Sequence, residues 1–174
     1  MTEIRMEDIL QEILKASSIA IAGHVRPDGD CVGSCLALYN YLTTICEGED
    51  FRVIDLYLED IPEKFKFLPG SDRSLKEPSN RSYDLLIVLD CASMDRIGVA
   101  PSVMEQSLQT LCIDHHVSNT HFARATLLDP GASSTCEILF EMMDYDRIDR
   151  NTAECLYLGI VHDTGVFRHS CTTQ

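Results

Sequence analysis

The sequence predicts an α/β protein with an open, doubly wound sheet of about five mostly parallel strands flanked by helices. Strand-like apolar runs alternate with segments of helical period, which is typical of this class. The run 85–89 is apolar throughout, as expected of a central parallel strand buried on both faces. At 174 residues, the chain is long enough for one domain with a substantial core, so we interpret residues 1–174 as a single domain.

Each element is predicted from its apolar spacing and its end signals. Apolar residues at helical spacing predict a first helix over 6–16. A longer helix follows, with Asp30 as its predicted N-cap and Glu47-Gly48 as its end. The remaining helices are predicted over 134–143 and 152–161. The predicted strands are 19–23, 51–58, 85–89, 110–113 and 125–128, and the segment 61–70, with two prolines, is predicted to be irregular.

Composition indicates a soluble globular protein and argues against several kinds of partner. Hydrophobic residues make up 45% of the chain, but the apolar runs are far shorter than the roughly 20 residues of a membrane span. The N-terminal segment MTEIRMEDILQEILK has no apolar core, so we predict no signal peptide and a cytoplasmic location. The net charge of −14 argues against binding long duplex nucleic acid, which depends on Lys and Arg at the phosphates. Bound divalent cations would still let an acidic site accept small phosphate esters.

Eight cysteines are scattered along the chain without a CxxC pair. Several stand inside apolar runs, where a reduced cysteine behaves as a small hydrophobic residue. Cys31 and Cys35 would lie one helical turn apart, a spacing that resembles half of a zinc site. The sequence contains no second pair of cysteines that could complete such a site. We therefore interpret the cysteines as reduced core residues.

Four segments carry the residues that a two-metal phosphoesterase needs, and three of them follow strand-like runs. In chain order their candidate residues are His24, Asp28 and Asp30; Asp90; Asp114, His115 and His116; and Asp163. The carboxyl ends of parallel strands converge on one crevice, so these distant residues can meet there. Mixed imidazole and carboxylate ligands suit Mn²⁺, Zn²⁺ or Fe²⁺. Asp90, after the central strand, is well placed to bridge two metals, and His115 would complete a second coordination sphere with Asp30, Asp90 and Asp163.

Each motif alone has a simpler interpretation. An aspartate after a strand is more often a cap or turn former than a ligand, and PDGD reads as a turn. The DHH run fits a capping aspartate followed by surface histidines. Four unrelated turns would then have to place His and Asp at one edge by coincidence, so we favour a common site. His162 fits a supporting hydrogen-bond donor and a surface residue about equally well.

The segments HVRPDGDCVGS, LDCASMDRIG, IDHHVSNT and GIVHDTGVFR resemble the ordered motifs of the DHH phosphoesterase superfamily. The runs DRIG (95–98) and DTGVFR (163–168) are most similar to its nano-RNase/pAp-phosphatase branch, the oligoribonuclease or RecJ-like enzymes. The resemblance extends from the first predicted strand to the end of the chain. Relatives carry a second, smaller domain, DHHA1, that grips the nucleotide. We expect this domain to be absent here, because the chain stops directly after the fourth motif.

The resemblance implies two bound Mn²⁺ ions, with Mg²⁺, Co²⁺ or Zn²⁺ as alternatives. One ion would be held by His24, Asp28 and Asp90, and the other by Asp30, Asp90, His115 and Asp163. His116 would contact the scissile phosphate, and His116 or Arg96 would offset the charge that builds on the phosphoryl oxygens. Two ions about 3.5–4 Å apart would activate a shared water for in-line attack.

The function implied is that of a metal-dependent phosphohydrolase acting on short oligoribonucleotides or on 3′-phosphoadenosine 5′-phosphate (pAp). An inorganic pyrophosphatase or polyphosphatase is the main alternative within the superfamily, and a cyclic-dinucleotide phosphodiesterase is another. From a different class, the alternative is a catalytically weak metal-binding fragment. The expected partners are a short RNA or a small nucleotide phosphate, without a membrane, and a homodimer is left open.

Overall fold

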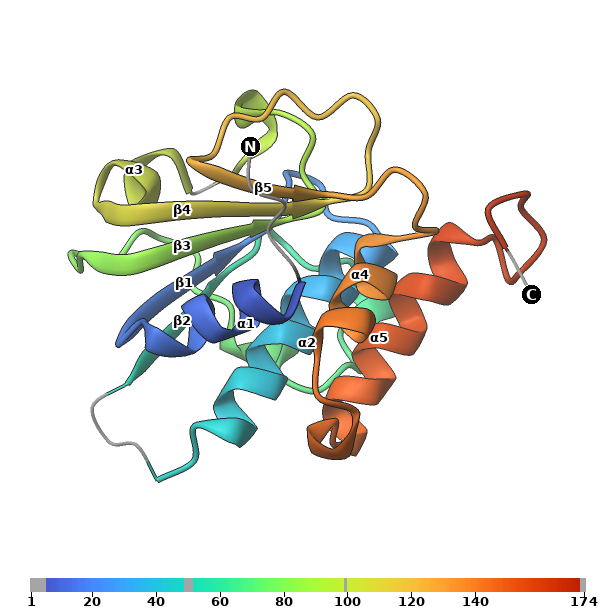
Figure 1. Ribbon diagram of the computed structural model, residues 1–174, viewed down its shortest axis with the longest axis horizontal. Coiled ribbons are helices and arrows are strands. Elements are labelled where there is room, and N and C mark those ends of the chain that lie inside the picture. Colours follow the sequence, from blue (N-terminus) through green and yellow to red (C-terminus); the bar gives the residue numbers. More distant parts are fainter. Residues whose placement is uncertain (1–5, 49–51, 99, 173–174) are drawn as a thin grey trace.

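The computed structural model describes residues 6–48, 52–98 and 100–172. It contains a single parallel sheet (Figure 1). The strands are β1 (Ser18–Ala22), β2 (Val53–Tyr57), β3 (Tyr83–Leu89), β4 (Ser107–Asp114) and β5 (Ala125–Leu128). Their order is β2-β1-β3-β4-β5, and all four pairings are parallel. The predicted α/β class and the five-stranded parallel sheet are therefore confirmed.

Helices cover both faces of this sheet, but one face carries four of the described helices and the other carries one short helix (Figure 1). They are α1 (Met6–Lys15), α2 (Gly29–Ile45), α3 (Ala100–Glu105), α4 (Thr135–Met142) and α5 (Arg150–Asp163). Figure 1 shows α1, α2, α4 and α5 on one side of the strands and the short α3 on the other. Short 3₁₀ turns occupy Glu63–Phe65, Ser71–Arg73, Met94–Arg96 and Tyr145–Arg147. Within the described ranges, no helix combines the length and apolar character needed to cross a membrane.

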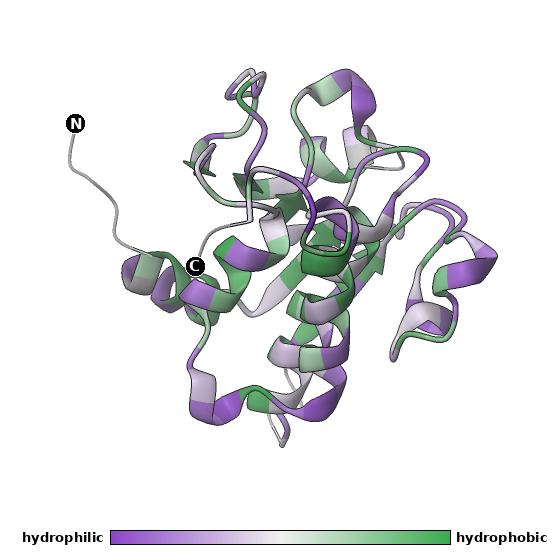
Figure 2. Cartoon of the chain, turned by 90° about the vertical axis from the view of Figure 1, so that its right-hand side faces the viewer, coloured by the Kyte–Doolittle hydropathy of each residue, from purple (hydrophilic) through white to green (hydrophobic). Residues whose placement is uncertain are grey.

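Successive residues of the central strand enter two separate apolar cores. Ile87 and Leu89 pack with the helices of the larger face, whereas Leu86 and Val88 pack with Val103 of α3 on the other face. This follows from the two-residue period of a strand, which sends neighbouring side chains to opposite faces. The unbroken apolar run of β3 is thus explained by burial on both sides. Figure 2 shows the corresponding green, apolar stretches of the helices alternating with purple, polar ones.

Two glycines allow α2 and α5 to approach closely. A Cβ on Gly33 would lie 2.7 Å from the carbonyl oxygen of Cys155 and 3.1 Å from the amide nitrogen of Gly159. A Cβ on Gly29, one turn earlier in α2, would collide with His162, near the end of α5. The two helices are therefore antiparallel, and the start of α2 meets the end of α5. This packing brings two segments of the predicted site together.

We expect Gly33→Ala to lower the free energy of unfolding by about 1–3 kcal/mol, the usual cost of overpacking a tight contact. Alanine normally stabilises a helix interior relative to glycine, but here the added methyl group meets rigid backbone atoms of α5. Denaturant unfolding measures the difference. Gly131→Ala is the control, because the nearest atom to its Cβ belongs to the Asp129 side chain; equal stability of both variants would contradict the close-packing argument.

The structure corrects the predicted start of α2. Asp28, not Asp30, is the N-cap: its backbone is extended, and its Oδ1 accepts hydrogen bonds from the amides of Asp30 and Cys31, both at 3.1 Å. Asp30 lies in the first turn and is fully buried. Sequence alone could not choose between them, because both are aspartates next to a glycine.

Other boundaries moved by a few residues. The predicted strand over 51–58 is observed as Val53–Tyr57, and Phe51 lies outside the described residues. β3 begins at Tyr83, earlier than predicted, because Tyr83 already pairs with Ser107 of β4. The polar Asp84 fits within the strand, since its carboxylate accepts hydrogen bonds from the amides of Ser17 (2.9 Å) and Ser18 (3.1 Å). The short helix α3 was not predicted, since its six residues are too few to show a helical period.

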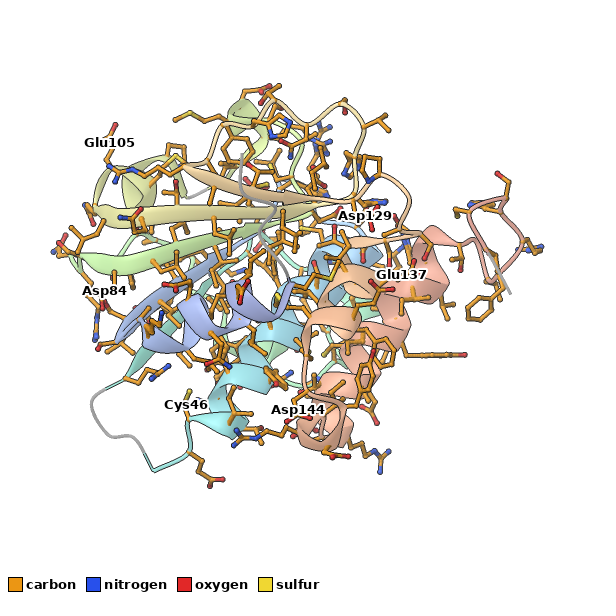
Figure 3. The ribbon with its side chains drawn as sticks, viewed as in Figure 1. Cys46, Asp84, Glu105, Asp129, Glu137 and Asp144 are labelled. Atoms are coloured by element: carbon orange, nitrogen blue, oxygen red, sulfur yellow. The ribbon has the colours of Figure 1, made fainter. Side chains whose placement is uncertain are left out.

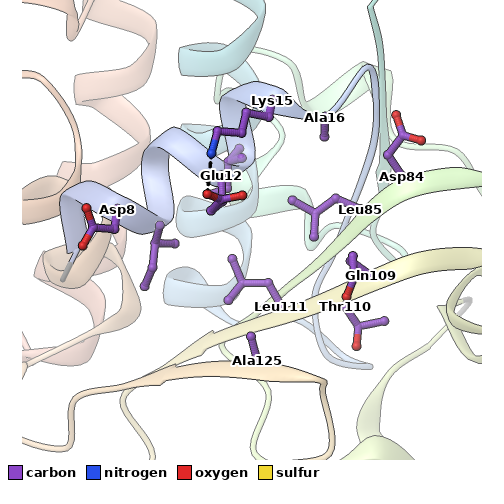
Figure 4. A pocket seen from close by; sticks show the side chains of 12 residues that line it. Asp8, Glu12, Lys15, Ala16, Asp84, Leu85, Gln109, Thr110, Leu111 and Ala125 are labelled. Atoms are coloured by element: carbon purple, nitrogen blue, oxygen red, sulfur yellow. Dashed lines mark hydrogen bonds and ion pairs between the residues drawn. The ribbon is translucent and has the colours of Figure 1, made fainter. Parts of the chain in front are cut away.

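A cavity of about 620 Å³ lies between α1 and strands β3 to β5 (Figure 4). Asp84 and Ala125, near the amino ends of β3 and β5, help to line it, and an ion pair between Lys15 and Glu12 (2.6 Å) stands at its edge. None of the predicted site residues lines this cavity. The predicted metal ligands lie at the opposite edge of the sheet, beyond the carboxyl ends of the strands, and Asp163 reaches this edge at the end of α5.

Candidate metal centre

Three neighbouring strands bring three of the predicted ligands to one edge of the sheet. β1, β3 and β4 are adjacent, and the chain beyond their carboxyl ends holds His24, Asp90 and His115. The chain continues from β1 to β2 on one side and from β3 to β4 on the other. The crevice between β1 and β3 is therefore a topological switch point, where open α/β sheets bind ligands.

Asp90 stands at the centre of the crevice. It is 2% exposed, and its backbone is left-handed, with φ of 53°, a conformation that aspartate tolerates better than most residues. Its Oδ2 lies 3.6 Å from Nε2 of His24, and its Oδ1 lies 3.6 Å from Nε2 of His115. Thr135 donates a hydrogen bond to Oδ1 at 3.2 Å. Oδ2 thus faces His24, and Oδ1 faces His115 and, at 3.6 Å, Nδ1 of His116.

His24 and Asp28 form the first group with Asp90. The Val25 carbonyl lies 2.8 Å from Nδ1 of His24, and a carbonyl can only accept a hydrogen bond, so Nδ1 carries a proton. This leaves Nε2, which lies 3.8 Å from Oδ1 of Asp28, to face the carboxylates. Burial lowers the pKa of His24, but the contacts with Asp28 and Asp90 outweigh it and raise the pKa to about 12.

Asp30, His115 and Asp163 form the second group. Nε2 of His115 lies 3.3 Å from Oδ2 of Asp163 and 4.0 Å from Oδ2 of Asp30. Asp30 is held by the amino end of α4, where the amides of Thr135 and Cys136 donate to its carboxylate at 2.7 and 3.0 Å. Burial, and then the charges of Asp90 and Asp163, raise the pKa of the Asp30 carboxyl well above its usual range.

The amino end of α4 is itself fixed by its own side chains. Ser134 caps the helix by accepting a hydrogen bond from the amide of Glu137 at 3.1 Å. The Glu137 carboxylate, labelled in Figure 3, accepts one from the amide of Ser133 at 2.5 Å. This reciprocal arrangement resembles a capping box. It orients the two amides that hold Asp30.

These groups fit divalent cations. Within the described residues, Nε2 of His115 is buried and makes no hydrogen bond, although carboxylates of Asp30, Asp90 and Asp163 lie 3.3–4.0 Å from it. Burial lowers the pKa of His115, but the contact with Asp163 and the charges of Asp90 and Asp30 raise it to about 9, so a proton balances the carboxylates in the metal-free protein. A divalent cation would replace that proton and give Nε2 the partner it lacks.

His116 is oriented by a buried carboxylate. Its Nδ1 donates to Oδ1 of Asp114 at 2.7 Å, and Asn119 donates to Oδ2 of the same carboxylate at 2.7 Å. The hydrogen bond to Asp114 raises the pKa of His116 above its usual value. Because Nδ1 is engaged, Nε2 of this half-exposed ring is left for another partner.

Arg96 and His162 lie at the margin of the site. The Arg96 side chain is exposed, and its Nη2 comes within 3.5 Å of Nδ1 of His24. Both nitrogens carry protons, so this is a contact rather than a hydrogen bond. His162 lies close enough to Asp28 and Asp163 for the three to share an ion, and its ring packs edge-on against Phe65 at 5.8 Å.

Sequence reasoning missed three contributors to the site. Thr135 holds Asp90, and the amides at the start of α4 hold Asp30. Cys31 lies beside His24 and Asp90, with ligand atoms of all three within 4.8 Å of one another. The sequence predicted α4 and the position of Cys31 on a helix, but only tertiary packing brings them to the crevice.

Comparison with known proteins identifies the family. A match to the DHH family, N-terminal domain, spans residues 18–160. The bifunctional oligoribonuclease and PAP phosphatase NrnA of Thermus thermophilus is 32% identical, over 95% of this chain and 49% of its own length. NrnA of Bacillus subtilis is 29% identical, over 96% of this chain and 52% of its own length.

More distant relatives share the same domain. The cyclic-di-AMP phosphodiesterase PdeA of Listeria monocytogenes is 25% identical, over 91% of this chain and 26% of its own length. The crystal structure of an exopolyphosphatase-related protein from Bacteroides fragilis superposes with a TM-score of 0.83 at 27% identity, covering 97% of this chain and 52% of that one. The chain spans about half the length of the NrnA proteins. With a family match over most of its residues, the chain belongs to the DHH family.

Proposed function

We propose that the crevice binds two divalent metal ions and hydrolyses phosphate esters, with short oligoribonucleotides and pAp as substrates. The observation that carries the proposal is the buried Nε2 of His115, which makes no hydrogen bond within the described residues and lies 3.3–4.0 Å from the carboxylates of Asp30, Asp90 and Asp163. An imidazole nitrogen facing several carboxylates is a ligand set for Mn²⁺ or a similar ion. The 32% identity to an oligoribonuclease and PAP phosphatase over nearly the whole chain supports the substrate class.

The proposed ligands divide into two sets that share Asp90. His24, Asp28 and Asp90 would hold one ion, and Asp30, Asp90, His115 and Asp163 the other. When bound, such a pair supplies Lewis-acid activation of water and neutralises charge on the phosphoryl oxygens. The protein contributes fixed positions for these ligands through the Val25 carbonyl, the amides at the start of α4 and the Thr135 hydroxyl.

His116 is proposed to act on the substrate and not on the metals. The Asp114 carboxylate fixes the ring and favours its protonated form. A cationic imidazole can donate from Nε2 to a phosphoryl oxygen and stabilise the charge that builds there. Exposed Arg96, beside His24, is proposed to bind a second phosphate oxygen, for which a guanidinium is well suited.

Polyphosphate or pyrophosphate is the second candidate substrate. The observation that favours it is the close structural similarity to an exopolyphosphatase-related protein, with a TM-score of 0.83. The two candidates differ in what must be recognised beyond the phosphates: a nucleoside in one case and nothing in the other. Competition by a nucleoside monophosphate therefore separates them.

A panel of substrates tests the proposal. The Mn²⁺-loaded protein is incubated with a diribonucleotide, pAp, cyclic-di-AMP, pyrophosphate and a short polyphosphate, and the products are separated by chromatography. We expect nucleoside monophosphates from the dinucleotide and AMP with phosphate from pAp. Turnover of pyrophosphate or polyphosphate alone would support the second candidate. A protein that hydrolyses none of these compounds, with Mn²⁺ bound, would contradict the proposed function.

We expect Asp114→Asn to lower kcat by about 10–100-fold, by analogy with losses of groups that orient a metal-bound or catalytic histidine. The amide keeps the volume of the carboxylate but removes the charge that favours the His116 cation. Steady-state kinetics should show a smaller change in KM than in kcat, and elemental analysis should show metal content close to wild type. An unchanged kcat would show that Asp114 has no role in positioning His116.

A further inference from the structure

The side chain of Cys31 lies within the first metal group. Its Sγ, a ring nitrogen of His24 and a carboxylate oxygen of Asp90 are all within 4.8 Å of one another. All three side chains are buried, with exposures of 0%, 4% and 2%. Nitrogen, sulfur and oxygen at such separations can bind a single ion, and this combination suits Zn²⁺ and other ions with affinity for thiolates.

Two local features place the sulfur there. The backbone N–H of His24 donates a hydrogen bond to Sγ of Cys31 at 3.3 Å and fixes the position of the sulfur. Burial raises the pKa of the Cys31 thiol well above its usual range, so the thiol keeps its proton until a metal ion displaces it. Gly23 leaves the space that the sulfur occupies, because a Cβ at that position would overlap Sγ. Any side chain at residue 23 would thus displace the thiol from the group.

The position of Cys31 distinguishes it from the other cysteines. Cys35 is equally buried, one turn along α2. Among the described residues, Cys31 is the only cysteine in the clusters close enough to share an ion. The neighbours of Cys31 in this cluster are His24 and Asp90, beyond the ends of β1 and β3. A metal site of this composition needs only one thiol, so the lack of a second cysteine pair is no argument against it.

We propose that Cys31 is a ligand of the first metal ion and gives this position a preference for thiophilic divalent ions, such as Zn²⁺ or Cd²⁺, over Mn²⁺. The inference rests on the proposed function, since it adds a ligand to the same centre. On binding, the sulfur–metal bond replaces the S–H bond, and the proton passes to the solvent. The second ion, held by oxygen and nitrogen alone, would keep its preference for Mn²⁺.

Cadmium titration of the metal-free protein tests this proposal. We expect an ultraviolet thiolate-to-cadmium charge-transfer band in the wild type that saturates with the first ion. Cys31→Ser and Cys31→Ala should lose this band and weaken Cd²⁺ binding on the order of tenfold or more, since changes even to groups that merely support a ligand cost 10–100-fold. Affinity for Mn²⁺, measured by calorimetry, should change much less.

Cys35→Ala is the matched control, because it removes an equally buried thiol from the same helix and should retain the band. Circular dichroism verifies that each variant is folded, and cadmium NMR of the wild type gives a second readout, since a sulfur ligand shifts the resonance far downfield of an oxygen and nitrogen site. Cadmium bound without a band that depends on Cys31, or without the downfield shift, would overturn the inference and leave the proposed function intact. A wild-type protein that binds no divalent ion would contradict both.

Discussion

Asp90→Asn is expected to lower kcat for a dinucleotide by about a thousandfold or more. The carboxylate offers one oxygen to each metal group, at 3.6 Å from His24 and 3.6 Å from His115, so its charge supports both ions. Losing about 4 kcal/mol of charge stabilisation corresponds to that factor, at roughly 1.4 kcal/mol per decade. The amide has nearly the same shape, so the loss reports on charge and coordination and not on packing.

One measurement, a comparison variant and a control test the sharing of Asp90. Calorimetric titration with Mn²⁺ should show weaker binding at both positions in Asp90→Asn, whereas Asp163→Asn should weaken only one. Asp84→Asn is the matched control, since Asp84 lies at the other end of the same strand and its carboxylate accepts hydrogen bonds from the amides of Ser17 and Ser18, away from the metal groups. If Asp90→Asn lost one ion and kept the other at wild-type affinity, Asp90 would not be shared.

The histidine pair is expected to separate metal binding from catalysis. His115→Ala should lose one metal ion together with activity, because its Nε2 is proposed as a ligand. His116→Ala should retain both ions and still lose about 10²–10³-fold in kcat, the range seen when one donor to a developing oxyanion is removed. A fall in kcat and kcat/KM by the same factor would identify a contact made only in the transition state.

Elemental analysis of both variants, together with steady-state kinetics, tests this division. The adjacent histidines are well matched for the comparison, because their rings lie 4.5 Å apart and contact the same Asp90 carboxylate. Equal loss of metal from both variants would show that His116 is a ligand as well. Unchanged turnover in His116→Ala would remove it from the proposed mechanism.

Much of the fold and the gathering of the site could be predicted from the sequence. The apolar run 85–89 marked the central strand, and its burial on both faces explains why that signal was so clear. The convergence of His24, Asp90 and His115 followed from a general property of parallel sheets, whose carboxyl ends share one edge. The observed order places the strands of these three residues next to one another.

The details that depend on side-chain direction could not be predicted. Asp28 and Asp30 are equivalent as caps in the sequence. The structure distinguishes them, because Asp28 accepts the capping hydrogen bonds of α2 whereas Asp30 accepts those of the α4 amides. The thiol of Cys31 was interpreted as a core residue because its partners, His24 and Asp90, are not cysteines. The short helix α3 has too few residues to show a helical period. Its residue Val103 is nevertheless buried in the apolar core on the smaller face of the sheet, with Leu86 and Val88.

Electron paramagnetic resonance of the Mn²⁺-loaded protein tests the central claim most directly. If two ions share Asp90, two equivalents of Mn²⁺ should bind per chain, and their spectrum should show the spin coupling of a close pair. Asp90→Asn should abolish that coupling. One tightly bound ion per chain, or two ions with the uncoupled six-line spectra of isolated Mn²⁺, would contradict a shared two-metal centre.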